Sequence, residues 1–169
     1  MDIRGYFGGA VKKVFIPKKG VKEGGFSILK GVADGTEQTM YFDGGAVPNP
    51  GRAAGAAVIG SLKGLVRLDY ATNNQAEYSG LIKGLKLALD NDIKRLYIMG
   101  DSKLILSQIE GVWKVDNPDL KKMHAEAYEM LAKFDFVATK WIPREQNAEA
   151  DALATRGIST APAALPNTP

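Results

Sequence analysis

Four acidic residues of this chain stand at the edges of apolar segments, where side chains can do chemistry. Asp43 and Asp101 each follow a strand-like apolar run. Glu77 and Asp151 each lie near the start of a segment with helical periodicity. Carboxylates at such edges can converge on one mouth of a folded sheet, and clustered carboxylates are the ligands that Mg²⁺ binds. The pattern therefore favours metal-dependent phosphoester chemistry.

Each of these acids also has a purely structural explanation. Asp43 could form a turn before two glycines, and Glu77 could be the third helical residue of a capping box opened by Asn74. Asp101 could cap a helix, and Asp151 could interact with a helix macrodipole. All four acids, however, lie beside elements that would have to share one end of a sheet. This combination favours the functional interpretation.

Hydrophobic periodicity predicts an α/β domain between residues 38 and 157. Short apolar runs separated by turn signals come first, and segments with an apolar stripe at helical spacing follow. The order βββαβααβα describes a mixed sheet with helices on its faces. The predicted strands are 38–46, 54–60, 63–70, 94–100 and 136–142, and the predicted helices are 74–91, 102–110, 118–134 and 147–157.

The composition indicates one globular domain with modest appendages. The 169 residues are 45% hydrophobic and 24% charged, which is enough to bury one core. With no cysteine, the chain has no disulfide, no thiol nucleophile and no zinc–thiolate site. Charges interrupt its apolar stretches too often for a membrane span, and its first residues lack the apolar region of a secretory signal. We expect an intracellular protein, in the nucleus or cytoplasm.

Two flanking segments differ from this domain in composition. Residues 1–37 are rich in Gly and Lys, and residues 1–38 carry the whole net charge of +3. We interpret residues 1–37 as a basic, flexible N-terminal extension with room for one added strand. Residues 158–169 contain three prolines and no charged residue, which predicts a disordered tail.

Several polar residues have a structural role by default and a nucleic-acid role as the alternative. Asn49 lies in a turn signal, and Asn74 and Gln75 are helix caps first. Each of the three could also offer its amide to a nucleic-acid backbone. Trp113 and Lys114 could be ordinary packing and a solvated charge. They could also stack on a base and contact a phosphate, since aromatic residues beside lysines suit nucleotides.

Four segments of the chain resemble type 1 ribonuclease H. They are Tyr-Phe-Asp-Gly-Gly-Ala-Val-Pro-Asn-Pro-Gly (41–51), Thr-Asn-Asn-Gln-Ala-Glu-Tyr (72–78), Gly-Asp-Ser (100–102) and Asn-Ala-Glu-Ala-Asp-Ala-Leu-Ala (147–154). The likeness runs in order over residues 38–157, with spacings that suit the family. It implies a ribonuclease H-like α/β fold, a five-stranded mixed sheet flanked by helices. It also implies an endonuclease that hydrolyses the RNA strand of RNA–DNA hybrids.

The same resemblance implies roles for individual residues. The implied catalytic residues, which would also bind two Mg²⁺ ions (or Mn²⁺), are Asp43, Glu77, Asp101 and Asp151. Two ions about 4 Å apart would activate a water and stabilise the leaving 3′-oxygen, which leaves 5′-phosphate and 3′-hydroxyl ends. The 2′-hydroxyls of the hybrid would distinguish RNA from DNA. The implied contacts to the hybrid are Gly44, Asn49, Asn74, Gln75, Trp113, Lys114 and Arg144.

The chain departs from many members of this family at two places. The loop before Asp151 carries Arg144, a candidate contact to a phosphate or product, but lacks the histidine thought to assist product release. This loop is similar to that of archaeal and plant-type members. The chain also leaves no room for the basic handle helix of some relatives, and lysines 12, 13, 18 and 19 are candidates to compensate. We interpret the sole histidine, His124, as structural.

The first seven residues look like a clipped sliding-clamp-binding peptide. The aliphatic residue Ile3 is followed three places later by the aromatic pair Tyr6 and Phe7. The alternative is a mobile N-terminus. A replication clamp would then be a second partner beside the RNA–DNA hybrid, and the enzyme would act in DNA replication. We expect a monomer that does not bind membranes.

Two other functions fit the same motifs less well. Another nuclease of the same superfold, such as a resolvase or exonuclease, would share the acids, because a fold alone does not determine the substrate. The Asn-Pro-Gly and Thr-Asn-Asn segments favour a hybrid-specific enzyme instead. A non-catalytic module that binds hybrids or a clamp would need none of the four acids, and all four are present.

Overall fold

Strand β3 (Gln38–Val47) is the strand around which the sheet is organised. It pairs in parallel with β6 (Arg95–Gly100) and antiparallel with β4 (Gly51–Ile59). Beyond β6 lies β7 (Phe136–Trp141), again parallel, and beyond β4 lies β5 (Leu62–Ala71), antiparallel. The computed structural model describes residues 14–160, and in this part of the chain the sheet has seven strands in the order β1-β2-β7-β6-β3-β4-β5.

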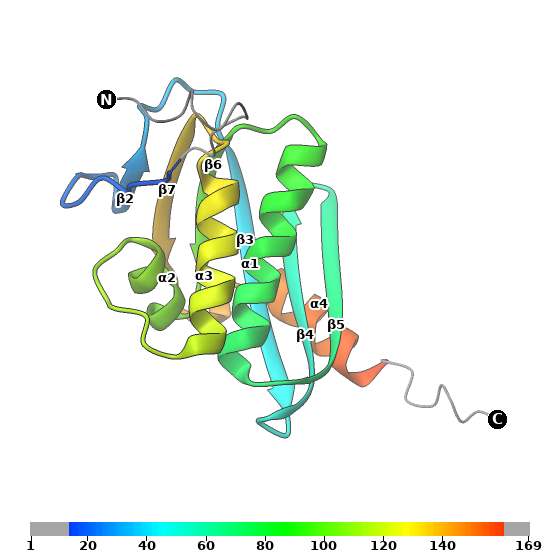
Figure 1. Ribbon diagram of the computed structural model, residues 1–169. Coiled ribbons are helices and arrows are strands. Elements are labelled where there is room, and N and C mark those ends of the chain that lie inside the picture. Colours follow the sequence, from blue (N-terminus) through cyan, green and yellow to red (C-terminus); the bar gives the residue numbers. More distant parts are fainter. Residues whose placement is uncertain (1–13, 161–169) are drawn as a thin grey trace, which may run out of the picture.

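Helices cover both faces of this sheet (Figure 1). Helices α1 (Asn73–Asp90), α2 (Lys103–Ile109) and α3 (Pro118–Leu131) lie on one face, and α4 (Ala148–Ser159) lies on the other. The larger apolar core fills the space under the first three helices, and a smaller one lies under α4. Nearly every residue of β4 is buried, since this strand has a helix on each face.

The predicted elements between residues 38 and 157 are all present, with boundaries that differ by up to three residues. The largest difference at a helix end is in α3, which was predicted to reach residue 134 and ends at Leu131. A short 3₁₀ helix, η2 (Arg144–Gln146), precedes α4. In the part of the chain that the structure describes, no helix is long and apolar enough to cross a membrane.

Two strands precede the five predicted ones, where the sequence left room for one. A hairpin of β1 (Lys22–Glu23) and β2 (Phe26–Lys30) pairs with the outer edge of β7. The ring of Phe26 lies 4.6 Å from that of Tyr97, which in turn lies 5.2 Å from that of Phe136. Pairing with β2 gives the backbone groups at the outer edge of β7 hydrogen-bond partners, and the ring contacts bury apolar surface where the hairpin meets the sheet.

The expected flexible extension over residues 1–37 is therefore wrong for its described part. Phe15, Ile28 and Leu29 are buried in apolar clusters of the domain, so residues 14–37 are continuous with it. The proposed clamp-binding residues Ile3, Tyr6 and Phe7 and the lysines at 12 and 13 lie outside the described residues. At the other end, α4 runs to Ser159, so the first residues of the predicted disordered tail are helical, and residues 161–169 lie outside the described part.

Thr72 and Ser102, and not the predicted acids, cap the helices next to the candidate site. Thr72 accepts a hydrogen bond from the backbone N–H of Gln75 (3.1 Å), and the Gln75 side chain accepts one from the N–H of Thr72 (2.8 Å). This pair is the capping box of α1. Ser102 caps α2 by accepting from the N–H of Ile105. The capping explanations for Glu77 and Asp101 are therefore wrong, because neither carboxylate caps a helix.

Helix α1 packs unusually close to β3, because glycine occupies the points of contact. A Cβ atom on Gly44 would lie 2.2 Å from the carbonyl oxygen of Ala76, and one on Gly80 would lie 2.3 Å from that of Asp43. Real Cβ atoms essentially never come this close to another heavy atom. The backbones of the helix and the strand therefore touch directly, which brings the first turns of α1 beside Asp43.

This contact predicts that Gly80→Ala destabilises the protein. In an ordinary helix, replacing glycine with alanine stabilises the helix by about 1 kcal/mol. Here the added methyl must displace α1 from β3, and we expect the free energy of unfolding to fall by about 1–3 kcal/mol. Urea denaturation measures it. Gly45→Ala is the matched control, because the nearest atoms to its Cβ lie 3.9 Å away. Equal urea midpoints for the two variants would refute the packing argument.

Candidate active site and metal centre

The parallel pairing of β3 with β6 brings two of the four predicted acids together. Tyr41 pairs with Met99, and two residues further along these strands stand Asp43 and Asp101. Asp43 does not end its strand, as the sequence suggested, since β3 continues to Val47. Strand β6 ends at Gly100, so Asp101 leaves the sheet beside the continuing β3. A carboxylate inside one strand thus meets a carboxylate just beyond its neighbour.

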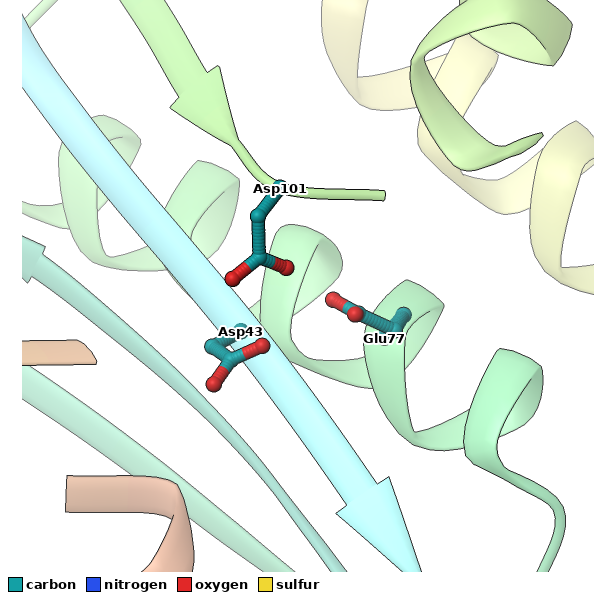
Figure 2. A group of neighbouring side chains, drawn as sticks. All are labelled: Asp43, Glu77 and Asp101. Atoms are coloured by element: carbon teal, nitrogen blue, oxygen red, sulfur yellow. The ribbon is translucent and has the colours of Figure 1, made fainter. Parts of the chain in front are cut away.

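Glu77 joins this pair from above the sheet. It lies in the second turn of α1, which Gly44 and Gly80 allow to touch β3. Figure 2 shows the carboxylates of Asp43, Glu77 and Asp101 pointing toward one another from a strand, a helix and a strand end. One oxygen atom from each of the three carboxylates lies within 4.8 Å of the other two.

Asp151 completes the set from the opposite layer. It lies on α4 and lines, with the other three acids, an open hollow of ≈ 530 Å³ at this end of the sheet. Its carboxylate is 3.5 Å from the guanidinium of Arg144, which lies in η2 and lines the same hollow. All four acids predicted from the sequence therefore face one space, although Asp151 stands outside the tightest group of three.

The pKa values of Asp43, Glu77 and Asp101 are raised above the usual range of carboxyl groups. Burial raises the pKa of Asp43 to about 7, and the nearby charges of Asp101 and Asp151 add to the effect. Burial and the charge of Asp43 raise the pKa of Glu77 well above its usual range. Burial also raises the pKa of Asp101, although a hydrogen bond from Asn147 opposes this. Both desolvation and mutual repulsion disfavour the charged forms, as expected for clustered acids.

A divalent cation would relieve this unfavourable arrangement. One carboxylate oxygen of Glu77 is buried and has no hydrogen-bond partner. A buried polar atom without a partner costs free energy unless an ion or a water satisfies it. Because oxygen ligands with negative charge are those that hard divalent cations prefer, Asp43, Glu77 and Asp101 could hold a metal ion.

The predicted substrate amides lie next to this hollow, in a second one of ≈ 440 Å³ at the start of α1. Asn49, Asn74 and Gln75 all line it. The Asn49 side chain accepts a hydrogen bond from the backbone N–H of Asn73 (2.9 Å), and Gln75 is engaged in the capping box. These two side chains therefore also stabilise the fold.

The remaining predicted contacts divide into two groups. Gly44 and Arg144 line the carboxylate hollow. Trp113 and Lys114 do not line it: the Trp113 side chain is about half exposed in the loop after α2, and the Lys114 ammonium lies 3.6 Å from a carboxylate oxygen of Asp116. The structure does not bring these two residues to the four acids.

Sequence reasoning assigned no role to Asn147, which supports the site from within. Its side chain is buried, and its Nδ2 donates to the carbonyl oxygen of Phe42 (2.9 Å) and toward Asp101 Oδ2 (3.5 Å). It thus connects the start of α4 to β3 and to a carboxylate. Its place at the start of the fourth motif segment was the one available signal, because its partners lie far away in the sequence.

Two other residues near the acids were also overlooked. Trp141 donates from Nε1 to the backbone carbonyl oxygen of Asp101 (3.0 Å), and Asn73 accepts from the backbone N–H of Ala46 (2.8 Å). Both line the carboxylate hollow. These hydrogen bonds hold the backbone at Asp101 and at Ala46, two places that border the hollow.

Comparison with known proteins agrees with this geometry. A family model described as reverse transcriptase-like matches residues 41–157. Ribonuclease HI of Halobacterium salinarum is 39% identical over 127 residues, which are 72% of this chain and 64% of that protein. Its crystal structure superposes with a TM-score of 0.71 at 37% identity and covers 74% of this chain and 99% of that chain. This chain belongs to the type 1 ribonuclease H family.

Two further proteins share this domain. LC11-RNase H1, solved in complex with an RNA/DNA hybrid, has a TM-score of 0.69 and 34% identity over 74% of this chain and 99% of that chain. The bifunctional protein Rv2228c of Mycobacterium tuberculosis is 36% identical over 126 residues, 70% of this chain but 35% of that protein. The chain thus spans about a third to two thirds of the length of these curated relatives.

The raised pKa of Asp43 predicts that the metal-free protein loses stability as the pH rises. Between pH values of about 4 and 7, folded Asp43 keeps a proton that it has already lost in the unfolded chain. We expect the free energy of unfolding to fall by on the order of 2–4 kcal/mol across this window. The lowered pKa values of Asp34 and Glu37 act in the opposite sense but only at more acidic pH.

Urea denaturation in the presence of a chelator, at pH values of about 5 and 7.5, measures this loss. In Asp43→Asn the loss should be smaller by the share of Asp43, while the raised pKa values of Glu77 and Asp101 leave a remainder. Adding a divalent cation to the unmutated protein at the higher pH should restore stability. Parallel pH dependences in the two proteins would contradict the buried, protonated Asp43.

A second prediction concerns Asn147. Asn147→Ala removes a donor to the Phe42 carbonyl and to Asp101. We expect a loss of about 1–3 kcal/mol in stability, because a buried acceptor is left unsatisfied, and a higher pKa of Asp101, measured by NMR titration of its carboxyl carbon. Asn117→Ala removes the N-cap of α3 and should cost about 1 kcal/mol without moving that pKa. An unchanged Asp101 pKa in Asn147→Ala would refute the positioning role.

Proposed function

We propose that this chain is a metal-dependent endonuclease that hydrolyses the RNA strand of RNA–DNA hybrids. The observation that carries the proposal is the convergence of Asp43, Glu77, Asp101 and Asp151 on one hollow of a type 1 ribonuclease H domain. The hybrid bound in the structure of the similar LC11-RNase H1 supports this choice of substrate. It favours a hybrid nuclease over another nuclease of the same superfold and over a non-catalytic module.

The four acids are suited to hold two Mg²⁺ ions, with Mn²⁺ as a substitute. The ions, when bound, would activate the attacking water and stabilise the leaving 3′-oxygen, so that the products carry 5′-phosphate and 3′-hydroxyl ends. The unpartnered oxygen of Glu77 and the raised pKa of Asp43 fit this ligand role. Both carboxylates would bind in their charged forms, because the cation offsets their repulsion.

The protein's own groups would orient the substrate around these acids. Arg144 lies at the rim beside Asp151 and offers a guanidinium, which binds phosphate oxygens well. Asn74 lines the neighbouring polar hollow, where an amide could contact a 2′-hydroxyl of the RNA strand. Asn147 and Trp141 would hold Asp101 in place while the reacting linkage changes its charge.

A cleavage assay with four labelled substrates tests the proposal: an RNA–DNA hybrid, duplex RNA, duplex DNA and single-stranded RNA. With Mg²⁺ we expect cuts in the RNA strand of the hybrid and much slower cleavage of the other three. Cleavage of duplex DNA at a rate equal to that of the hybrid would favour the other nucleases of this superfold.

The same assay tests two of the four acids. Asp43→Asn and Asp101→Asn should each reduce hybrid cleavage by about 100-fold or more, the size of loss seen when one group that stabilises transition-state charge is removed. Asp92→Asn is the matched control, since Asp92 is exposed at the far end of α1 and asparagine tolerates its positive φ of 58°. Full activity in both site variants would remove the carboxylate assignment.

A further inference from the structure

A second hollow lies beside the carboxylates, on the side of the added hairpin. It measures ≈ 330 Å³ and lies between β2, β7 and α2. Trp141 lines both this hollow and the carboxylate hollow, so the two adjoin on either side of one exposed indole. The hairpin of β1 and β2 contributes Lys22, Gly25 and Ser27 to its wall.

Lys22, Lys103 and Lys140 line this hollow and give it positive charge. We call this hollow the lysine groove. The three ammonium groups come from β1, α2 and β7. Glu110 is the one acid that lines the groove, and its carboxylate accepts a hydrogen bond from Thr139 (2.8 Å). The charged side chains of the groove therefore sum to a positive charge directly next to an acidic site.

None of these lysines is neutralised within residues 14–160. Lys22 donates to the hydroxyl of Ser27 (2.7 Å). The ammonium of Lys103 lies 4.8 Å from the ring centre of Trp141, and that of Lys140 lies 5.3 Å from the ring centre of Phe26. No ion pair with a carboxylate is found for any of the three in the described residues. These contacts orient the ammonium groups and leave their charges available for a ligand.

The ligand that fits is a row of phosphates. Lysines, hydroxyls and an exposed aromatic ring around one open groove are the groups that bind a nucleic-acid backbone. The four carboxylates repel the phosphates of a strand whose reacting linkage lies over them. Beyond Trp141 the charged side chains are mainly lysines, which attract phosphates. The polar hollow on the other side, by contrast, is lined by amides and by one charged residue, Asp119.

We propose that the lysine groove binds backbone phosphates of the nucleic-acid substrate on the Trp141 side of the cleaved linkage. The proposal rests on the proposed function and extends it, because it gives the β1–β2 hairpin a part in substrate binding. The hairpin would then supply positive charge that the neutral main domain lacks. The groove would also determine on which side of the cleaved linkage the protein contacts the longer stretch of nucleic acid.

Salt-dependent binding tests the groove. We would compare a variant with Lys22→Gln, Lys103→Gln and Lys140→Gln with a control carrying Lys86→Gln, Lys94→Gln and Lys133→Gln. The control lysines are exposed, and Lys94 and Lys133 lie just before β6 and β7, at the end of the sheet away from Asp101. The two variants carry the same change in net charge. Their affinity for an RNA–DNA hybrid, with EDTA present to prevent cleavage, is measured by fluorescence anisotropy over a range of NaCl concentrations.

Each lost phosphate contact should reduce the slope of log affinity against log salt by about 1. We therefore expect the slope of the groove variant to be lower by about 2–3, with binding about 10-fold weaker or more near 0.1 M salt. The control should stay close to the unmutated protein. Equal slopes and affinities in the two variants would overturn the groove.

Crosslinking provides a second measurement that does not depend on charge. Because the chain has no cysteine, Ser107→Cys places a unique thiol in the groove, and Ser61→Cys places one in the turn between β4 and β5. Labelled with a photo-crosslinker, the groove thiol should attach to nucleotides on one side of the cleavage position, and the control thiol should not. Attachment on both sides equally, or none, would refute the proposed path.

The two proposals fail in different ways. Hybrid cleavage by the unmutated protein reports on the proposed function alone. If the protein binds hybrid with the expected difference in slope but does not cleave it, the groove stands and the nuclease assignment falls. If it cleaves hybrid and both variants bind alike, the nuclease assignment stands and the groove falls.

Discussion

The direct contact between helix α1 and strand β3 is the constraint on which the site depends. Glycines at 44 and 80 remove the side chains that would otherwise separate the two backbones. This lowers α1 onto the sheet and brings Glu77 to the place where Asp43 and Asp101 meet. Larger side chains at these two positions would force α1 away from β3 and move Glu77 away from the other two carboxylates. Packing in the core therefore determines the geometry of the chemistry.

That geometry opposes stability in the absence of a cation. Burial and repulsion raise the pKa of Asp43, Glu77 and Asp101, so the site favours protons or a metal over bare charges. The fold holds the carboxylates together nonetheless, through the close packing of α1 and the hydrogen bonds of Asn147. Sites of this kind commonly reduce stability in exchange for function. Binding of a metal ion would return part of the lost free energy.

The N-terminal hairpin joins this arrangement from the edge of the sheet. Its apolar residues cover the outer edge of β7, and its Lys22 faces the groove next to Trp141. One short segment thus closes the core and changes the charge beside the active site. The same strand β7 ends at Trp141, which holds the backbone of Asp101. Strand β7 therefore connects the hairpin at its outer edge to the backbone of Asp101.

Local patterns in the sequence determined most of the elements between residues 38 and 157 and the identity of the four acids, because periodicity and motifs act over a few neighbouring residues. They did not reveal that Asp43 lies inside a strand, since the small residues after it resemble a turn. They left room for one added strand in residues 1–37 but did not reveal the hairpin of two strands, because its pairing with β7 joins residues far apart in the chain. The role of Asn147 was hidden because its partners, Phe42 and Asp101, are distant in the chain. Strand register and close packing, which join residues far apart, were decided by the tertiary structure alone.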